Sequence, residues 1–305
     1  MCVLAHHLYQ HSNLLRTGYL KLFGTGFQAL GYLSVAVFFF LSGYGLFASF
    51  NGRPDSIKTF PKNKILPFYL SNVILVLIYS SFKTLILKEL ITFPELVRSL
   101  AFGGAVIDNG WYIQVQLVYY FMFFFVFRKM TTEGWLPKIL FLNALYVLGC
   151  VLAGFSTLYY ERTLIFVLGM QWYARRKDID SVLEKKGLAI WIASAALFAG
   201  CYGLSKYQGW MLRGVSYFFF IPTVLIPLRK IRIKNKITCF LGKISFEIYV
   251  MQGLFFTLFH SNKAKIDSPY LYIVMVTFAT FVSAYLIHPV FRFIYKSCRD
   301  TSDTK

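Results

Sequence analysis

Nine mostly apolar stretches run along this chain, and they limit its possible folds more than any other feature. They lie near 29–50, 65–87, 111–127, 136–158, 163–174, 188–205, 210–228, 237–259 and 270–295. A helix needs about 20 mostly apolar residues to span a bilayer, and most of these stretches approach that length. The stretch at 163–174 is shorter, so we expect its helix to begin within 155–162. The sequence predicts an all-α bundle of about nine membrane spans.

The amino-acid composition supports the same fold class. Hydrophobic residues make up 57% of the 305 positions and charged residues only 15%, whereas a soluble globular protein has about 25% charged residues. This excludes a disordered chain and argues against an ordinary soluble enzyme. No Pro-rich linker or internal repeat interrupts the pattern. We therefore expect one domain over 1–305, in which 1–10 is the remnant of a first span and 296–305 is a cytoplasmic tail.

The charge pattern predicts the orientation of the chain. The 32 Lys and Arg against 13 Asp and Glu give a formal net charge of +19, which in a soluble protein would suggest a nucleic-acid partner. Here one alternating set of connections between the apolar stretches holds more than twice as many Lys and Arg as the other. By the positive-inside rule the richer set, which includes the 51–64 loop and the C-terminus, is cytoplasmic. We expect an integral membrane protein in a lipid bilayer, with no nucleic-acid partner.

Four groups of polar residues fall where a bilayer would disfavour them. Polar groups within membranes are costly and usually face the bundle interior or a water-filled cavity. Spacings of four and three place Ser245, Tyr249 and Gln252 on one helix face, away from Glu247. The other groups are His6, His7 and His11 near the start, Ser42, Gly43 and Tyr44 in the 29–50 stretch, and Gln114 and Gln116 after Trp111.

Each group also has a purely structural interpretation. Ser and Gly within spans often allow close helix packing, Gln and Ser side chains can bond to a neighbouring helix, and a neutral Glu247 can bond to a backbone carbonyl. Two adjacent histidines can simply be solvated, or can ligate a metal. No further cluster completes a metal site, so we expect none. The cysteines are scattered, which indicates isolated thiols: Cys2, Cys150, Cys201, Cys239 and Cys298.

Lysines gather just before Pro67 in the 51–64 loop. Lys58, Lys62 and Lys64 are compact positive charges at the mouth of a predicted span. Such charges suit a phosphate group, but they also serve as a topology signal. The charge pattern alone leaves both interpretations open.

Several motifs occur in the order found in one family of membrane enzymes. They are Leu4-Ala5-His6-His7-Leu8, the Phe-rich run from Val35 to Leu46, Lys62 to Pro67, Trp111 to Tyr120, and Leu241 to Gln252 with Gly242-Lys243-Ile244-Ser245. With these motifs the chain resembles the integral-membrane acyltransferase 3 family, which includes O-acetyltransferases of bacterial surface polysaccharides. The resemblance covers roughly residues 4–295.

This resemblance implies a ten-span bundle in the bacterial inner membrane. The bundle would move an acyl group, often acetyl, from cytoplasmic acyl-CoA to a hydroxyl of a cell-envelope polysaccharide. His6 or His7 would be the general base or a transient acyl carrier, roles that suit a side chain titrating near neutrality. The co-substrate acyl-CoA, with no tightly bound cofactor, would contact Ser42, Gly43, Tyr44, Lys62 and Lys64. Candidates for substrate contact or proton relay are Trp111, Gln116, Ser245, Glu247, Tyr249 and Gln252.

The chain also departs from the family pattern. The family usually has an arginine in the first span, well before the histidine, and the start of this chain at Met1 favours a missing N-terminal segment. Lys62 and Lys64 stand where arginines are frequent, Gln116 where many relatives have Glu, and Gln252 where many have His. Two other functions stay open: a transporter or flippase for a lipid or glycan, and a truncated, inactive relative.

Overall fold

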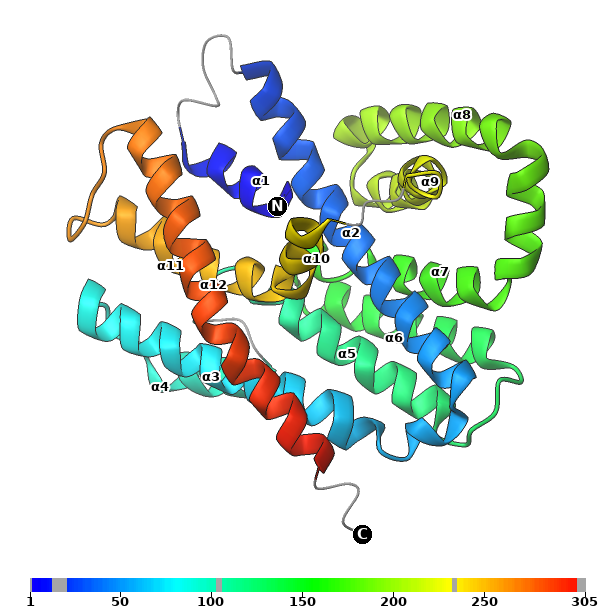
Figure 1. Cartoon of the computed structure of the whole chain (residues 1–305), viewed down its shortest axis with the longest axis horizontal. Coiled ribbons are helices and arrows are strands. Elements are labelled where there is room, and N and C mark those ends of the chain that lie inside the picture. Colours follow the sequence, from blue (N-terminus) through cyan, green and yellow to red (C-terminus); the bar gives the residue numbers. More distant parts are fainter. Residues whose placement is uncertain (1, 13–20, 103–105, 232–234, 301–305) are drawn as a thin grey trace. The chain divides into compact units, whose positions relative to one another are not determined.

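The described part of the chain is helical. The computed structural model describes residues 2–12, 21–102, 106–231 and 235–300; Met1 of the expected first-span remnant and residues 301–305 of the expected tail lie outside them. Helices account for 84% of the structure, and these residues form no strand. The all-α prediction is therefore confirmed (Figure 1).

Each predicted apolar stretch coincides with a helix in whole or in part. The α-helices are α1 Cys2–His11, α2 Lys21–Gly52, α3 Leu66–Phe82, α4 Phe93–Phe102, α5 Trp111–Phe127, α6 Trp135–Leu152, α7 Thr163–Ala174, α8 Arg176–Gln208, α9 Trp210–Leu228, α10 Lys236–Lys243, α11 Ser245–His260 and α12 Pro269–Asp300. Shorter turns are η3 Pro54–Ile57, η4 Pro61–Ile65, η5 Lys83–Leu87 and η6 Thr157–Tyr159.

Six helices within the described residues are long and apolar enough to cross a membrane, or seven if α10 and α11 together form one bent span. α5 is apolar but shorter than the others. These helices support an integral membrane protein. A total of nine spans stays a prediction.

Two details of the predicted spans are wrong. α7 begins at Thr163 and does not extend back into 155–162, because Gly154 has a φ of +69° and the separate turn η6 follows it. The stretch 237–259 is not one straight helix, because α10 and α11 meet at an angle of 67°. Ile244 lies at this break with φ −103° and ψ 14°, and the Ser245 hydroxyl donates a hydrogen bond to the carbonyl of Gly242 at 3.0 Å.

The chain divides into two compact units, each assembled from segments that are distant in the sequence. Unit 1 comprises Met1–Tyr32, Thr59–Val118 and Asn235–Lys305. Unit 2 comprises Leu33–Lys58 and Tyr119–Lys234. The long helix α2 contributes its first part to unit 1 and the rest to unit 2.

In unit 1, α1 packs against α11, and α11 packs against α12. A buried cluster joins the three helices through Leu4 and Leu8, Ile248 and Phe256, and Tyr272 and Val276. Lipid tails are as apolar as these side chains, so close packing rather than exclusion of water holds such helices together. This packing fixes the position of α1 and of its histidines.

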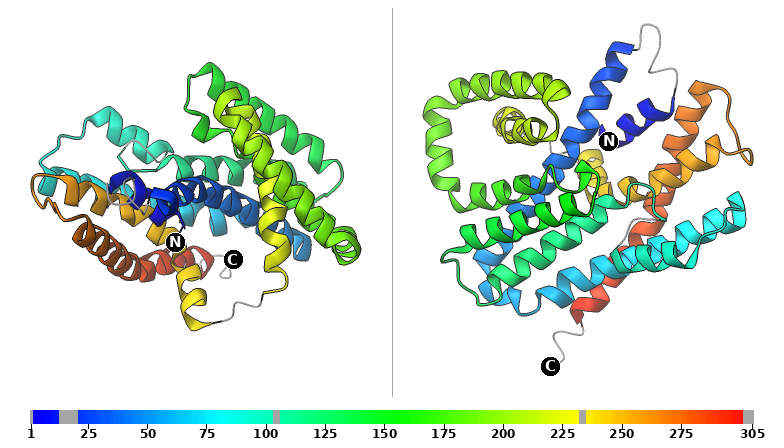
Figure 2. Two further views of the ribbon diagram at one scale, coloured as in Figure 1. Left: turned by 90° about the horizontal axis from the view of Figure 1, so that it is seen from above. Right: turned by 180° about the vertical axis from the view of Figure 1, so that it is seen from behind.

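In unit 2, α8 runs along α9, and α8 changes direction at Lys186, whose φ is −127° (Figures 1 and 2). α2 and α7 approach each other closely at two glycines. A Cβ added to Gly43 would overlap the backbone carbonyl of Phe166, and one added to Gly169 would overlap that of Phe40. The packing interpretation of Ser42–Gly43 is thus supported, because only glycine lets the two backbones approach so closely.

Candidate functional site

The two adjacent histidines of α1 are buried in unit 1 and point to different neighbours. His6 is 4% exposed and its ring contacts that of Tyr32, with centroids 4.8 Å apart. His7 is 8% exposed; it lies beside the side chain of Gln252 and against the edge of the Phe256 ring at 5.8 Å. His6 therefore packs on α2, whereas His7 lies against the polar face of α11.

Two further histidines extend this cluster: His11 at the end of α1 and His260 at the end of α11. The ring of His11 stacks on Phe256 with centroids 4.8 Å apart, and it lies 5.3 Å from the ring of His260. His260 in turn meets the ring of Tyr272 on α12 at 4.7 Å. The Phe256 ring thus contacts both His7 and His11, His11 contacts His260, and the cluster ends at Tyr272 of α12.

Two of the residues predicted to share one face of α11 have polar contacts in the structure. Gln252 donates its amide N–H to the carbonyl of Tyr249 at 2.9 Å. The Tyr249 hydroxyl donates to the carbonyl of Asn109 at 3.0 Å, and its ring contacts Tyr112 at 5.1 Å. The Ser245 hydroxyl, at the start of the same helix, instead donates to the Gly242 carbonyl at the break between α10 and α11.

Asp108, an acidic residue that the sequence interpretation missed, precedes α5 and contacts α11. Asp108 accepts hydrogen bonds from the Thr257 hydroxyl at 2.9 Å and from the Lys83 ammonium at 3.3 Å. It lies near enough to His11 for their charges to interact. Beside it the buried Tyr79 hydroxyl donates to the carbonyl of Val250 at 2.7 Å. Together these groups give unit 1 a polar interior formed by α1, α3, η5 and α11.

Glu247 differs from its expected structural role. Instead of a backbone carbonyl, its carboxylate contacts Nδ1 of His288 on α12 at 2.6 Å. The carboxylate is 6% exposed and the imidazole 22% exposed, so the pair lies within the packing of α11 against α12. Of the remaining candidates, Gln116 is buried at 2% exposure and Trp111 is partly exposed.

A third basic side chain, that of Arg299, lies near the two lysines before Pro67. Lys62 and Lys64 lie in η4, which packs against α12, and the charge of Arg299 on α12 acts on Lys64. Like charges held this close repel each other unless an anion lies between them. The sequence shows Arg299 only as one of several basic residues near the C-terminus, and nothing in it links this arginine to η4.

The residues predicted to contact CoA do not all belong to one unit. Lys62 and Lys64 belong to unit 1, whereas Ser42, Gly43 and Tyr44 belong to unit 2, where the Tyr44 ring contacts that of Tyr173 at 5.2 Å. Their role in binding CoA stays a prediction. No group of three or more metal-ligating side chains was found among the described residues, and the expected absence of a metal site also stays a prediction.

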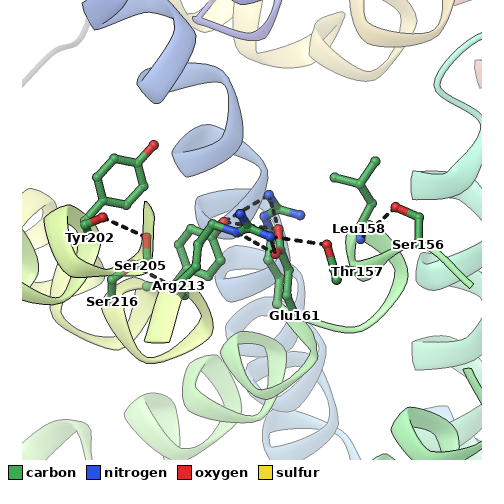
Figure 3. A network of polar contacts seen from close by, with 10 residues as sticks. Ser156, Thr157, Leu158, Glu161, Tyr202, Ser205, Arg213 and Ser216 are labelled. Carbon is green, nitrogen blue, oxygen red and sulfur yellow. Dashed lines mark hydrogen bonds and ion pairs between the residues drawn. The ribbon is translucent and has the colours of Figure 1, made fainter. Parts of the chain in front are cut away.

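Unit 2 contains a separate charged network that the sequence interpretation also missed (Figure 3). The Glu161 carboxylate pairs with Arg162 at 2.6 Å and with Arg213 at 2.7 Å. The Tyr217 hydroxyl accepts from Arg162 at 3.0 Å and donates to Glu161 at 3.2 Å, and Arg213 also donates to Thr157 at 3.2 Å. The adjacent Glu161-Arg162 pair just before an apolar helix is the one signal of this network in the sequence.

Comparison with known proteins identifies the family. A family model described as an acyltransferase domain matches residues 1–289. The chain belongs to the acyltransferase 3 family. No curated protein and no solved structure shows significant similarity to it. Membership in this family, together with the apolar helices, makes the chain a membrane acyltransferase in general terms.

Proposed function

We propose that this acyltransferase moves an acyl group, in the first instance acetyl, from acyl-CoA to a hydroxyl of a cell-envelope polysaccharide. The hydroxyl oxygen attacks the thioester carbonyl, so that a C–O bond forms and the C–S bond breaks. His7 accepts the hydroxyl proton and returns it to the departing thiolate, which leaves as CoA thiol. Alternatively the acyl group rests on the imidazole before the hydroxyl takes it, with the same overall balance.

The observation that carries this proposal is the position of His7. It is a buried imidazole beside Gln252, in the same polar interior as Asp108 and Thr257. A general base must lie within hydrogen-bonding reach of the proton that it takes. His6 packs on Tyr32 and close to Gly31 instead, so we assign it a positioning role for α1.

The residues near the two ends of α12 fit a reaction in which acyl-CoA binds on one side of the membrane and the acceptor glycan on the other. Arg299 at its last turn belongs with Lys62 and Lys64, and Tyr272 at its first turn contacts His260. A helical rise of about 1.5 Å per residue puts these ends about 40 Å apart, close to the thickness of a bilayer with its headgroups. We propose that the basic cluster binds the CoA phosphates at the cytoplasmic side, where the C-terminus would also lie.

The test uses membranes that contain the full chain, labelled acetyl-CoA and a crude envelope-glycan extract, with alkali-labile label in the glycan as the readout. His7→Ala is expected to lower transfer about 100-fold or more, because a general base is lost, with unchanged membrane insertion. His6→Ala should retain more activity than His7→Ala. Omitting the acceptor tests the carrier route, because label would then accumulate on the protein only when His7 is present.

Three results would contradict the proposal. Full transfer by the His7→Ala protein would remove the role of this histidine. Absence of label in the glycan when labelled acetyl-CoA is supplied would exclude this donor, and movement of a glycan without acylation would favour a transporter. A third variant, Lys62→Ala with Lys64→Ala, should raise the acetyl-CoA concentration needed for half-maximal rate; no change would leave these lysines as topology signals only.

A further inference from the structure

A pocket of about 300 Å³ opens next to the histidine cluster, and nothing described so far uses it. Its walls come from the end of α1, the end of α11, the connection between α11 and α12, and the start of α12. Its lining residues include His11, His260, Lys265 and Asp267. Its volume lies at the small end of the range for ligand pockets, about 300–1,000 Å³.

Two buried hydroxyls among its lining residues have no hydrogen-bonding partner within the described part of the chain. They belong to Ser12 and Tyr272, each 3% exposed. A buried hydroxyl without a partner costs about 1–3 kcal/mol, and a bound ligand or an ordered water removes this cost by supplying the missing bond. Two of them in one small pocket indicate a ligand that is itself rich in hydroxyl groups.

The charges around the pocket cancel. Lys265 and Asp267 form an ion pair of 2.8 Å, and both are exposed. The hydrogen bond to Asp267 and the charge of that carboxylate raise the pKa of the Lys265 ammonium, which therefore stays charged and paired. The remaining lining residues include no Asp, Glu, Lys or Arg. A phosphate or carboxylate group would find no uncompensated cation here.

We infer that this pocket binds one uncharged sugar unit of the acceptor glycan, with Ser12 and Tyr272 bonding to its hydroxyls. The inference rests on the proposed function and adds to it the class of acceptor and the residues that select it. The pocket borders the cluster that leads through His11 and Phe256 to His7. A sugar held there presents a neighbouring hydroxyl towards the proposed base. Acidic sugars, such as uronates, would be poor acceptors.

The experiment measures acetyl transfer by membranes with the full chain to an envelope-glycan extract separated by anion exchange into a neutral and an acidic fraction. Tyr272→Phe and Ser12→Ala should each raise the KM for the neutral fraction about three- to tenfold, the effect of losing one hydrogen bond. The KM for acetyl-CoA should not change. Thermal stability should be unchanged or higher, because each variant removes only an unpartnered group. Tyr285→Phe, at a 61% exposed tyrosine of the same helix, is the matched control.

A second variant tests the charge argument independently. Asp267→Asn leaves Lys265 without its counter-charge at an exposed position, so folding should be unaffected while labelling of the acidic fraction rises relative to the neutral one. Wild-type label confined to the acidic fraction, or an unchanged KM in both hydroxyl variants, would overturn the inference while leaving the proposed function in place. No acyl-CoA-dependent label in any fraction would instead reject the proposed function, and the inference with it.

Discussion

Each unit holds a carboxylate among cations and tyrosine hydroxyls, but the two carboxylates differ in how completely they are enclosed. Glu161 of unit 2 is 1% exposed and pairs with two arginines. Asp108 of unit 1 is 33% exposed and meets one lysine and one threonine. The Glu161 carboxylate is shielded from solvent by its two arginines, whereas the Asp108 carboxylate stays partly open to solvent beside its single lysine. The first arrangement suits a structural role and the second suits a site.

The glycines show the same contrast. In unit 2, Gly43 and Gly169 face backbone atoms of the opposite helix. In unit 1, Gly31 faces the His6 ring and Gly253 faces the side chains of Asp108 and Tyr79. Close approach therefore joins helices in unit 2, while in unit 1 it makes room for the polar side chains of the candidate site.

The largest expected effect on stability comes from neutralising Glu161, the carboxylate at the centre of the charged network of unit 2. Glu161→Gln leaves Arg162 buried without its full counter-charge, and breaking a buried pair in this way costs about 3–5 kcal/mol. We expect a marked fall in the temperature at which the purified protein loses its monomeric peak in size-exclusion chromatography. The exposed Glu133→Gln serves as the control. Equal stability of the two variants would show that the network contributes little to the fold.

A matched pair of tyrosines compares the units directly. Tyr217→Phe removes a hydroxyl that bonds to Arg162 and Glu161, and bonds to charged groups contribute about 1.5–3 kcal/mol. Tyr272→Phe removes a hydroxyl without a partner among the described residues, so its stability should match or exceed that of the wild type. The measurement is thermal unfolding of both proteins in the same detergent. A reversed order would contradict the contrast between the units.

The close contact of α2 with α7 is tested at two glycines of one helix. Gly43→Ala places a Cβ against the Phe166 carbonyl, and overpacking of this kind costs about 1–3 kcal/mol. Gly45→Ala has open space around its new Cβ, so it should be neutral or slightly stabilising. Both variants can be ranked by melting temperature. If Gly43→Ala were stable but needed more acetyl-CoA, the prediction of CoA contact at Ser42–Tyr44 would replace the packing interpretation.

The smallest change in stability is expected at Asp108, the partly exposed carboxylate of unit 1. Asp108→Asn removes one member of a partly exposed ion pair, and such pairs contribute about 0–1 kcal/mol. Acetyl transfer should nevertheless fall several-fold, because Asp108 lies near His11 within the candidate site. Melting temperature and transfer rate measured on one preparation separate the two effects. A large loss of stability with normal transfer would make Asp108 a structural residue like Glu161.

Hydropathy alone predicted where most helices lie, because an apolar stretch of sufficient length has few alternatives to a helix in a membrane. The limits of α5 and α9 agree with the predicted stretches 111–127 and 210–228. The break at Ile244 was not predicted, because the apolar pattern continues through it and only the backbone changes direction.

The site was predictable only in part. His7, Tyr249 and Gln252 stood out because polar groups are rare in such segments. Asp108 did not, since it lies in a short connection where a carboxylate is ordinary and only the tertiary fold brings it to Thr257. The pairing of His288 with Glu247, which joins α12 to α11, likewise depends on packing that no local pattern reveals.

The order of segments along the chain has a consequence for synthesis. Every residue of unit 2 has been made once the ribosome reaches Lys234, whereas unit 1 still lacks α10, α11 and α12. Domains tend to fold as their last segment emerges, so unit 2 can be complete while the earliest helix, α1, still waits for its partners. His7 meets Gln252 only when translation is nearly finished. A nascent chain therefore carries its histidines for most of its synthesis without a site around them, since Gln252 and Phe256 belong to a helix made late.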